Sequence, residues 1–347
     1  MDKGSIAAFV AGLVGLLAAI VSLVLSRSAI KQAELSRRDF AAIFRRALGA
    51  DAHQEFVGQY AKSIEQLGSN MAAARLGGLH ALEALAIKYP DERQTIVSVL
   101  CAYLRMPFDF DPSSPRGGSE TEELAVRTSA QRIITTHLRM PGTESAGEVG
   151  SVTPHDFWPD IELDLTGAVL QDWNLEFCDL RRATFAEATF LGPARLSGAS
   201  FLTGVVFDGA LFVESADFDG VAFGGEARFN GATFSQETGF RSASFRGDAG
   251  FQGATFNGDA DFRGAKFEGY ARFQGAAFVA NAIFDGASFA GSARFLETSF
   301  SRHTSFVGAK VKTGDGRNDA WPPGWGISSG DQSGTAKLVQ RGQALGP

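Results

Sequence analysis

The sequence predicts an α + β solenoid: an N-terminal transmembrane helix, a small helical region and a long β-solenoid. Three observations predict this order. They are an uncharged run over residues 4–25, apolar residues at helical spacing over residues 51–139, and phenylalanines at alternating intervals of five and six over residues 201–306. Phe accounts for 30 residues against four Tyr and four Trp, so one kind of side chain must fill most of the repeated core.

The first element is a membrane span from Gly4 to Leu25. These 22 positions carry no charge, and about 20 apolar residues cross a hydrocarbon core of about 30 Å. The competing interpretation is a secretory signal peptide, which has a basic leading segment, a shorter apolar run and a small-residue cleavage site. Only Asp2 and Lys3 precede this run, and it ends without such a cleavage site, so an uncleaved anchor is favoured.

Orientation follows from the basic juxtamembrane helix expected over residues 26–50. This segment contains two acidic residues, Glu34 and Asp39, and six basic ones. The basic residues are Arg27, Lys31, Arg37, Arg38, Arg45 and Arg46. The positive-inside rule then leaves residues 1–3 outside and the bulk of the chain in the cytoplasm of a single-pass protein. Two roles stay open for these charges: binding the anionic inner leaflet, at about 1 kcal/mol per residue, or only stopping transfer.

Small residues recur every fourth position in the span. The pairs 8/12, 11/15 and 15/19 consist of Ala and Gly, a spacing that lets two helix backbones approach closely. A homodimer through Ala8, Gly12, Gly15 and Ala19 is therefore one expectation. Small residues are common in membrane spans, so the pairs can also have no such role.

Residues 51–139 are predicted to form a helical domain, followed by a linker and cap over residues 140–158. Apolar residues such as Ile96, Leu100 and Leu104 follow the helical stripe. His80 and His137 have no partner at metal-ligand spacing, so packing roles are expected. Cys101 and Cys178 are too far apart for a CxxC motif and indicate a reducing compartment, and no metal or cofactor site is expected.

The spacing of the phenylalanines excludes both a helix and a flat strand. On an α-helix, steps of five and six residues would place alternate rings about 140° apart, and in a flat strand an odd step would send Phe251 and Phe256 to opposite faces. The pattern works if the chain bends after each ring, at corners where Gly tolerates strained dihedral angles. An inward Ala then precedes each inward Phe by two positions, as Ala249 precedes Phe251 and Ala254 precedes Phe256.

This register runs without a break through 28 inward centres, from Leu165 to Val311. The first centres recur every five residues, and from Phe190 the steps alternate between six and five. The longer segment carries one extra residue just before its small inward residue, at positions such as Asp248, Asp259, Tyr270 and Asn281. Two kinds of segment must therefore alternate around each coil.

The stretch LTGAVLQDWNLEFCDLRRATFAEATF (165–190) resembles the pentapeptide-repeat family, whose unit is A-[D/N]-[L/F]-x-x. The resemblance implies a right-handed quadrilateral β-helix over residues 160–312, with four segments per turn and about seven coils. Trp173 and Cys178 replace the small residue and indicate an irregular first coil. The stretch at 60–86 is similar to a segment found upstream of the repeats in membrane-anchored members of the family.

A solenoid needs covered ends. Trp158 and the helical domain are expected to cap the first coil, and the stretch AWPPGW (320–325) the last. Residues 313–347 are thus divided into a cap and, from residue 326, a disordered tail.

The sequence contains no catalytic motif, and the stretch opening at Asp259 fails as a calcium loop because Tyr270 stands where Glu is required. An enzyme is therefore not expected. Arg228, Arg272 and Arg294 occupy equivalent outward positions, which favours solubility over a binding stripe.

The leading hypothesis is a membrane-anchored, non-enzymatic scaffold that binds an unidentified protein and no nucleic acid, as the net charge of −7 suggests. The alternative, from the family resemblance, is a DNA-mimicking inhibitor of a topoisomerase such as DNA gyrase. Residues 160–312 carry 19 acidic and 13 basic residues, a mixture too interleaved to imitate DNA well.

Overall fold

The computed structural model describes residues 51–108, 118–142, 156–314, 316–328 and 334–340. The chain divides into two compact units, residues 1–62 and 63–347. The expected span over residues 4–25, the basic segment over residues 26–50 and the Ala8 to Ala19 stripe lie outside the described residues. Within the described ranges, no helix combines the length and apolarity that crossing a bilayer requires.

The expected helical region is present. Its helices are α3 (Asp51–Leu67), which joins the two units, α4 (Ala72–Lys88), α5 (Arg93–Leu104), preceded by the short 3-10 helix η1 (Pro90–Glu92), and α6 (Gly118–Leu138). α4, α5 and α6 pack against one another around buried Leu82, Leu100 and Ile134. The apolar stripe read from the sequence therefore forms the core of this small bundle.

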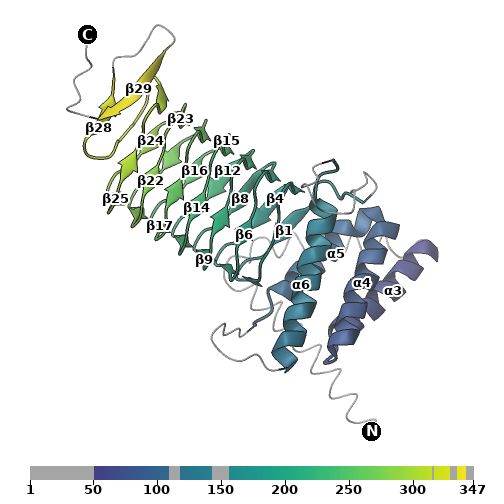
Figure 1. Cartoon of the computed structure of the whole chain (residues 1–347). Helices are drawn as coiled ribbons and strands as arrows, with labels where there is room; N and C mark the ends of the chain where they lie inside the picture. The colour runs from purple at the N-terminus through teal and green to yellow at the C-terminus, as the bar shows by residue number, and fades with distance from the viewer. Residues whose placement is uncertain (1–50, 109–117, 143–155, 315, 329–333, 341–347) are drawn as a thin grey trace, which may run out of the picture. The chain divides into compact units, whose positions relative to one another are not determined.

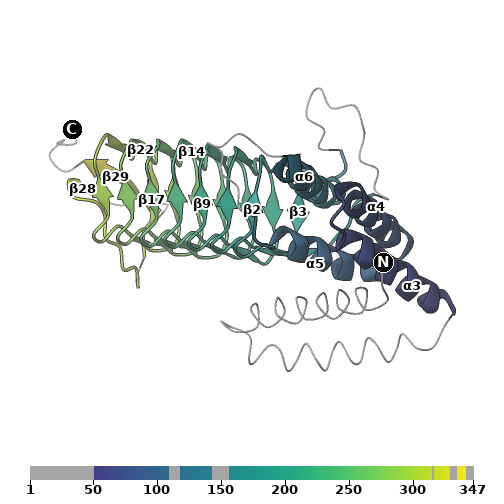
Figure 2. The same ribbon diagram turned by 90° about the horizontal axis from the view of Figure 1, so that it is seen from below.

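Four parallel sheets form the sides of a β-helix (Figures 1 and 2). Sheet I contains β1 (Glu162–Asp164), β4 (Arg182–Thr184), β8 (Gly204–Val206), β12 (Glu226–Arg228), β16 (Ala249–Gly250), β20 (Ala271–Arg272) and β24 (Ala293–Arg294). Sheet II contains β2 (Val169–Leu170), β5 (Thr189–Phe190), β9 (Leu211–Phe212), β13 (Thr233–Phe234), β17 (Thr255–Phe256), β21 (Ala277–Phe278) and β25 (Ser299–Phe300).

The other two sides are sheets III and IV. Sheet III contains β6 (Ala194–Arg195), β10 (Ala216–Asp217), β14 (Thr238–Gly239), β18 (Ala260–Asp261), β22 (Ala282–Ile283) and β26 (Thr304–Ser305). Sheet IV contains β3 (Asp179–Leu180), β7 (Ser200–Phe201), β11 (Ala222–Phe223), β15 (Ser244–Phe245), β19 (Lys266–Phe267), β23 (Ser288–Phe289) and β27 (Lys310–Lys312), and it continues into β29 (Thr335–Gln340) and β28 (Trp325–Ile327).

One coil takes 22 residues over most of the array. Phe223 pairs with Phe245 and Phe234 with Phe256, each with the residue one turn ahead. The first coil is shorter, since Glu162 pairs with Arg182. The strands from β1 to β27, with the isolated bridge at Asn174, form seven coils of four sides, which confirms the number expected from the sequence.

The core consists of four columns of stacked rings. The centroid of Phe229 lies 4.9 Å from that of Phe251 with the ring planes 2° apart, and Phe240 lies 4.8 Å from Phe262 with planes 3° apart. Rings of different columns meet edge to face, as Phe251 and Phe262 do at 5.6 Å and 90°, or tilted, as Phe251 and Phe256 do at 6.3 Å and 44°. The stacking distance equals the spacing between paired strands, so each ring fills one coil.

Glycines at the corners serve two different purposes. Gly264 has a φ of +67°, in the left-handed region that favours glycine. Gly269 lacks a positive φ, but a Cβ there would lie 2.5 Å from the main-chain oxygen of Gly247 in the previous coil. Conformational freedom, the reason expected from the sequence, therefore applies only to alternate corners.

The helical region covers the first coil through side-chain amides (Figure 1). The Gln94 amide on α5 donates to the carbonyl of Glu162 (2.9 Å) and accepts from its N–H (2.8 Å), as a neighbouring strand would. Gln131 on α6 does the same for Gln171, at 2.8 and 3.2 Å. The unpaired edges of sheets I and II are thereby satisfied without a further strand.

Residues in the last turn of α6 and just after it form hydrogen bonds with the other two sides of the first coil. The Thr135 hydroxyl donates to the carbonyl of Asn174 at 2.9 Å and accepts from the indole N–H of Trp173 at 2.9 Å. Met140 N–H donates to the carbonyl of Phe177 at 2.9 Å. The large side chain of Trp173, expected to mark an irregular coil, is thus part of the cap.

At the opposite end, Trp321 covers the last rings. Its ring lies 5.9 Å from Phe295 and 5.3 Å from Phe289, as expected for the AWPPGW stretch. The expectation of a disordered tail from residue 326 is wrong for residues 335–340, because β29 pairs antiparallel with β27 and with β28. Buried Ala336 and Leu338 give this strand an apolar face.

The register makes a prediction about two adjacent columns. We expect Phe262→Ala and Phe267→Ala each to lower the free energy of unfolding by about 3–5 kcal/mol, since both rings are at most 1% exposed. Thr255→Ala, an outward position of the neighbouring sheet II, should change it by no more than about 0.5 kcal/mol. Denaturant unfolding followed by circular dichroism measures the three, and a mild effect at one of the two phenylalanines would contradict the register.

Candidate interaction surface

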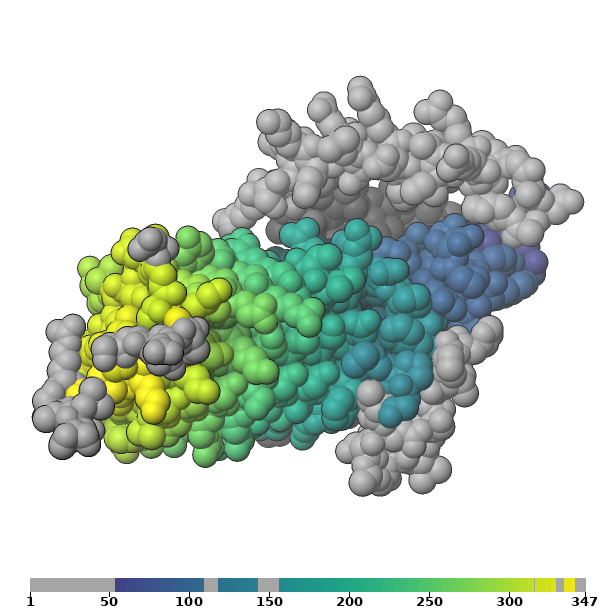
Figure 3. Space-filling view, turned by 90° about the horizontal axis from the view of Figure 1, so that it is seen from above, coloured from purple at the N-terminus to yellow at the C-terminus, as the bar shows by residue number. Residues whose placement is uncertain are grey.

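The four faces of the β-helix differ in charge because the 22-residue coil brings equivalent positions into rows. Charged side chains occupy the outward strand positions of sheet I (Arg228, Arg272), sheet III (Asp217, Asp261) and sheet IV (Lys266). In the uncovered part of the space-filling view the β-helix surface is filled and not hollowed (Figure 3). Flat faces, and no cleft, are what this part of the molecule offers a ligand.

Sheet II is the exception, and its outward surface is called the uncharged face below. The outward residues of its seven strands are Val169, Thr189, Leu211, Thr233, Thr255, Ala277 and Ser299. The residues that follow its inward side chains are Gln171, Leu191, Val213, Ser235, Asn257, Val279 and Ser301. None of these residues carries a charge, and the labels β2, β9 and β17 in Figure 2 mark every second strand of this sheet.

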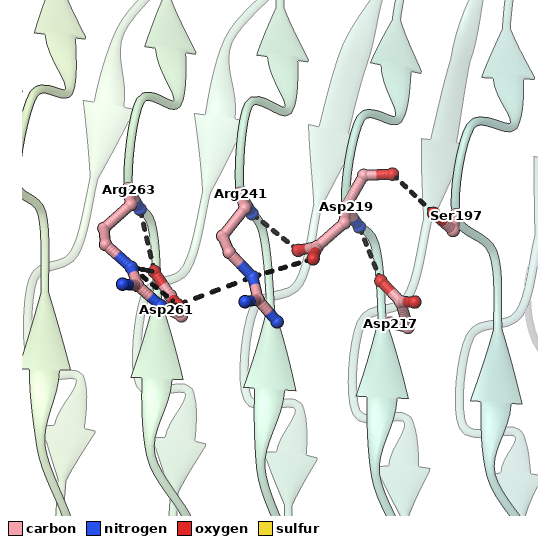
Figure 4. A network of polar contacts seen from close by, with 6 residues as sticks. All are labelled: Ser197, Asp217, Asp219, Arg241, Asp261 and Arg263. Carbon is pink, nitrogen blue, oxygen red and sulfur yellow. Dashed lines mark hydrogen bonds and ion pairs between the residues drawn. The ribbon is translucent and has the colours of Figure 1, made fainter.

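Sheet III carries a network of charges that runs across coils (Figure 4). Arg241 donates from its Nε to Asp219 at 2.8 Å, and the same Nε lies 3.5 Å from Asp261. Asp261 also accepts two hydrogen bonds from Nε of Arg263, both at 2.9 Å. Asp219 and Arg241 are 22 residues apart, so the coil length itself pairs them.

Asp261 is the residue for which the sequence is most misleading. It points away from the rings, as alternation predicts, yet it is only 7% exposed because the two arginines cover it. Burial alone would raise the pKa of the Asp261 carboxyl, but the hydrogen bonds and charge of Arg263, with the charge of Arg241, outweigh burial and lower it. The alternation of inward and outward residues alone predicts a solvated side chain at Asp261, and its burial shows that this interpretation is wrong.

The arginines that the sequence placed at equivalent outward positions do lie in one column on sheet I. Two of them form ion pairs with acidic residues of the β-helix. Pairing places Gly250 between Arg228 and Arg272, and Arg294 next to Arg272. Arg228 pairs with Asp208, and Arg272 donates to Asp248 at 2.7 Å while its guanidinium lies over the Tyr270 ring. The sequence favoured solubility over a binding stripe for this column, and the contacts add ion pairing within the β-helix for two of its arginines.

The residues that the sequence analysis considered as metal ligands or reactive groups have other partners or are buried. Asp259 accepts from the main-chain N–H of Asn281 at 3.0 Å, and across the described parts of the chain no group of three potential ligands could hold a metal ion. Burial raises the pKa of the thiols of Cys101 and Cys178 to about 12, so neither is a ready nucleophile. His137 has a partner that the sequence did not suggest, Glu83, at 3.0 Å.

A signal for the sheet III network was present in the sequence. Positions 197, 219, 241, 263 and 285 stand one residue after successive inward centres of one column and read Ser, Asp, Arg, Arg, Asp. When the sequence is aligned with a copy of itself shifted by 22 residues, the acid at position 219 stands beside the base at position 241. The lateral contact of Arg241 with Asp261 needs the coordinates, because it joins two different columns.

The network makes a second prediction. Asp261→Ala would leave two guanidinium groups without their shared carboxylate and should lower the free energy of unfolding by about 1 kcal/mol, a value kept small because both arginines are half exposed. Glu237→Ala, an exposed acid of the same β-helix, is the matched control and should have almost no effect.

The pKa gives the same prediction a pH dependence. Since the pKa of Asp261 is lowered, its contribution is present above the ordinary value of 3.8 and is lost as the pH falls through the lower folded value. Denaturant unfolding at pH 7 and pH 3 measures this. Equal effects of the two substitutions at pH 7 would show that the network contributes nothing.

Comparison with protein families agrees with this geometry. A family model described as pentapeptide repeats (9 copies) matches the chain in overlapping stretches, at residues 165–222, 185–233, 218–266 and 240–288. Comparisons with curated proteins and with solved structures give no significant match. The matched stretches lie within the seven coils described above and span the five-residue units and the alternating segments. Residues 165–288 of the chain therefore consist of pentapeptide repeats of this family.

Proposed function

We propose that the chain is a membrane-anchored, non-enzymatic scaffold whose β-helix holds a partner protein against the uncharged face. A pentapeptide-repeat solenoid supports an interaction or structural role. The observation that carries the proposal is the segregation of charge: the outward strand positions of sheet II and the residues after its inward side chains are uncharged over seven strands, and charges stand only at the following corner, at Asp172, Glu214 and Arg302.

Desolvation favours this face over the others. Binding a partner removes water from both surfaces, and a charge that loses water without gaining a partner costs several kcal/mol. A partner on sheet III would remove water from the half-exposed guanidinium groups of Arg241 and Arg263. A partner on sheet II would remove water from hydroxyl, amide and aliphatic groups. Interface centres in general are depleted of charge, so the partner should present an uncharged, largely apolar strip.

Rigidity adds to the argument. From β9 to β21, the outward residues of sheet II stand beside inward rings that are stacked on both sides, as Thr255 stands beside Phe256. A surface held in this way loses little conformational entropy when it binds. Val279, 44% exposed, supplies apolar area near the later coils.

The anchor rests on the sequence. The uncharged run from Gly4 to Leu25 and the basic residues that follow it favour a single span with the β-helix in the cytoplasm. Such a tether would hold the uncharged face near the membrane surface, where a bound partner becomes concentrated.

The alternative, DNA mimicry directed at a topoisomerase, is less favoured by the surface. A DNA mimic needs unbroken rows of negative charge along the rod. Here arginines interrupt the acids, as Arg241 follows Asp219 within one row and Arg228 pairs with Asp208 of a neighbouring row.

The proposal predicts a face-specific loss of binding. The full chain should sediment with membranes, and after solubilisation it should capture a partner that is lost from Thr233→Lys/Thr255→Lys. Ser244→Lys/Ser288→Lys, at the same outward strand position on sheet IV, is the matched control and should keep the partner.

Three outcomes would contradict this prediction. Capture by the sheet II variant at the parental level excludes the uncharged face, and loss in both variants shows that the lysines act nonspecifically. Recovery of the chain in the soluble fraction removes the anchor.

A further inference from the structure

His137, near the end of α6, lies buried where the helical region meets the chain entering the first coil. Its side chain is 3% exposed. Its Nε2 lies 3.0 Å from a carboxylate oxygen of Glu83 on α4, and its Nδ1 lies 2.7 Å from the main-chain carbonyl oxygen of Asp156. Both ring nitrogens therefore have one hydrogen-bond partner each.

Both of these partners accept hydrogen bonds. A neutral imidazole has one N–H and one bare lone pair, so in either tautomer one nitrogen would place its lone pair against an oxygen lone pair. Only the imidazolium, with a proton on each nitrogen, satisfies both contacts at once. The Glu83 carboxylate lies in the right place to balance the charge, and hydrogen bonding from His137 lowers the pKa of Glu83, which keeps it ionised.

The ring also binds the entering chain through its face. It stacks on the Trp158 indole with centroids 3.8 Å apart and planes 3° apart, and the Arg93 guanidinium lies over the same indole at 5.6 Å. The main-chain N–H of Trp158 donates to the main-chain carbonyl of His137 at 2.7 Å. Trp158 is fully buried and stands four residues before β1, so His137 joins two helices to the start of the β-helix.

We propose that His137 is a buried imidazolium that makes the joint between the helical region and the first coil sensitive to pH. With the proton in place, α4, α6 and the Asp156–Trp158 segment are held together. Loss of one proton turns either the Glu83 or the Asp156 contact into a repulsion between lone pairs. The charged and titratable groups around the ring are Glu83, His80 on the other oxygen of Glu83 at 3.2 Å, and Arg93 beyond the indole.

The sign of the pH dependence follows from linkage. The folded chain requires a proton that an unfolded imidazole releases near pH ~6.5. The contribution of the joint is therefore fully present below that pH and is lost as the pH rises and folded His137 gives up its proton. Near neutral pH, folding takes up a proton at this site.

Nitrogen NMR of the full chain, labelled with ¹⁵N-histidine, tests the proposal directly. At pH 7.5 both ring nitrogens of His137 should show the shifts of protonated nitrogen, and comparison with His137→Phe assigns the signal. His80, whose side chain is 54% exposed, serves as the internal reference. A neutral tautomer at His137 would overturn the proposal. If the variant fails to fold, the parent still decides, because the absence of any doubly protonated ring among its five histidines would overturn the proposal as well.

Thermal unfolding at pH 6.0 and pH 8.5 gives a second readout. The Tm of the parent should fall by roughly 2–4 °C between the two, as expected when one buried hydrogen bond is lost from a domain of this size. His80→Gln should show the same fall, and His137→Phe, which keeps a stacking ring but has no titrating nitrogen, should not. A fall that persists in His137→Phe would also refute the proposal.

Discussion

Stacking of identical rings at the strand spacing is the constraint on which the rest of the structure depends. Parallel strands repeat at about 4.8 Å, and the rings of Phe229, Phe251 and Phe273 follow one another at 4.9 and 4.8 Å. Rings of different columns also contact one another, edge to face as Phe251 and Phe262 do, or tilted as Phe251 and Phe256 are. No other apolar side chain of similar size stacks so flatly, which explains why 22 of the 28 inward centres are Phe.

The register set by the rings determines the chemistry of the surface. Once each ring lies over its counterpart 22 residues earlier, every outward residue lies beside its own counterpart, and rows of like or opposite charge arise. Asp219 and Arg241 attract each other along such a row, while the two rows of sheet II contain only uncharged residues. The interaction surface is thus a by-product of core spacing combined with the choice of outward residues.

The coil could be predicted from the sequence because its period is carried by a single residue type. The spacing of Phe251, Phe256 and Phe262 excludes helix and flat strand on geometry alone, and the structure confirms four sides and seven coils. Features that depend on contacts between columns or between regions could not be predicted. Arg241 reaches Asp261 across two columns, and Gln94 imitates a strand from a helix 68 residues away. β29 was missed because Gly and Ser precede it and its pairing partner is the last coil.

Deleting whole segments tests the 22-residue coil most directly. Removal of residues 241–262 takes out four segments and joins Phe240 to Arg263, which places Arg263 beside Asp219 where Arg241 had been. Removal of residues 241–256 takes out three intact segments, fewer residues in total, and turns each later side of the coil onto the wrong sheet. Unfolding by denaturant should be cooperative and close to that of the parent for the first deletion and lost for the second. Equal stability of the two deletions would contradict the coil on which this account rests.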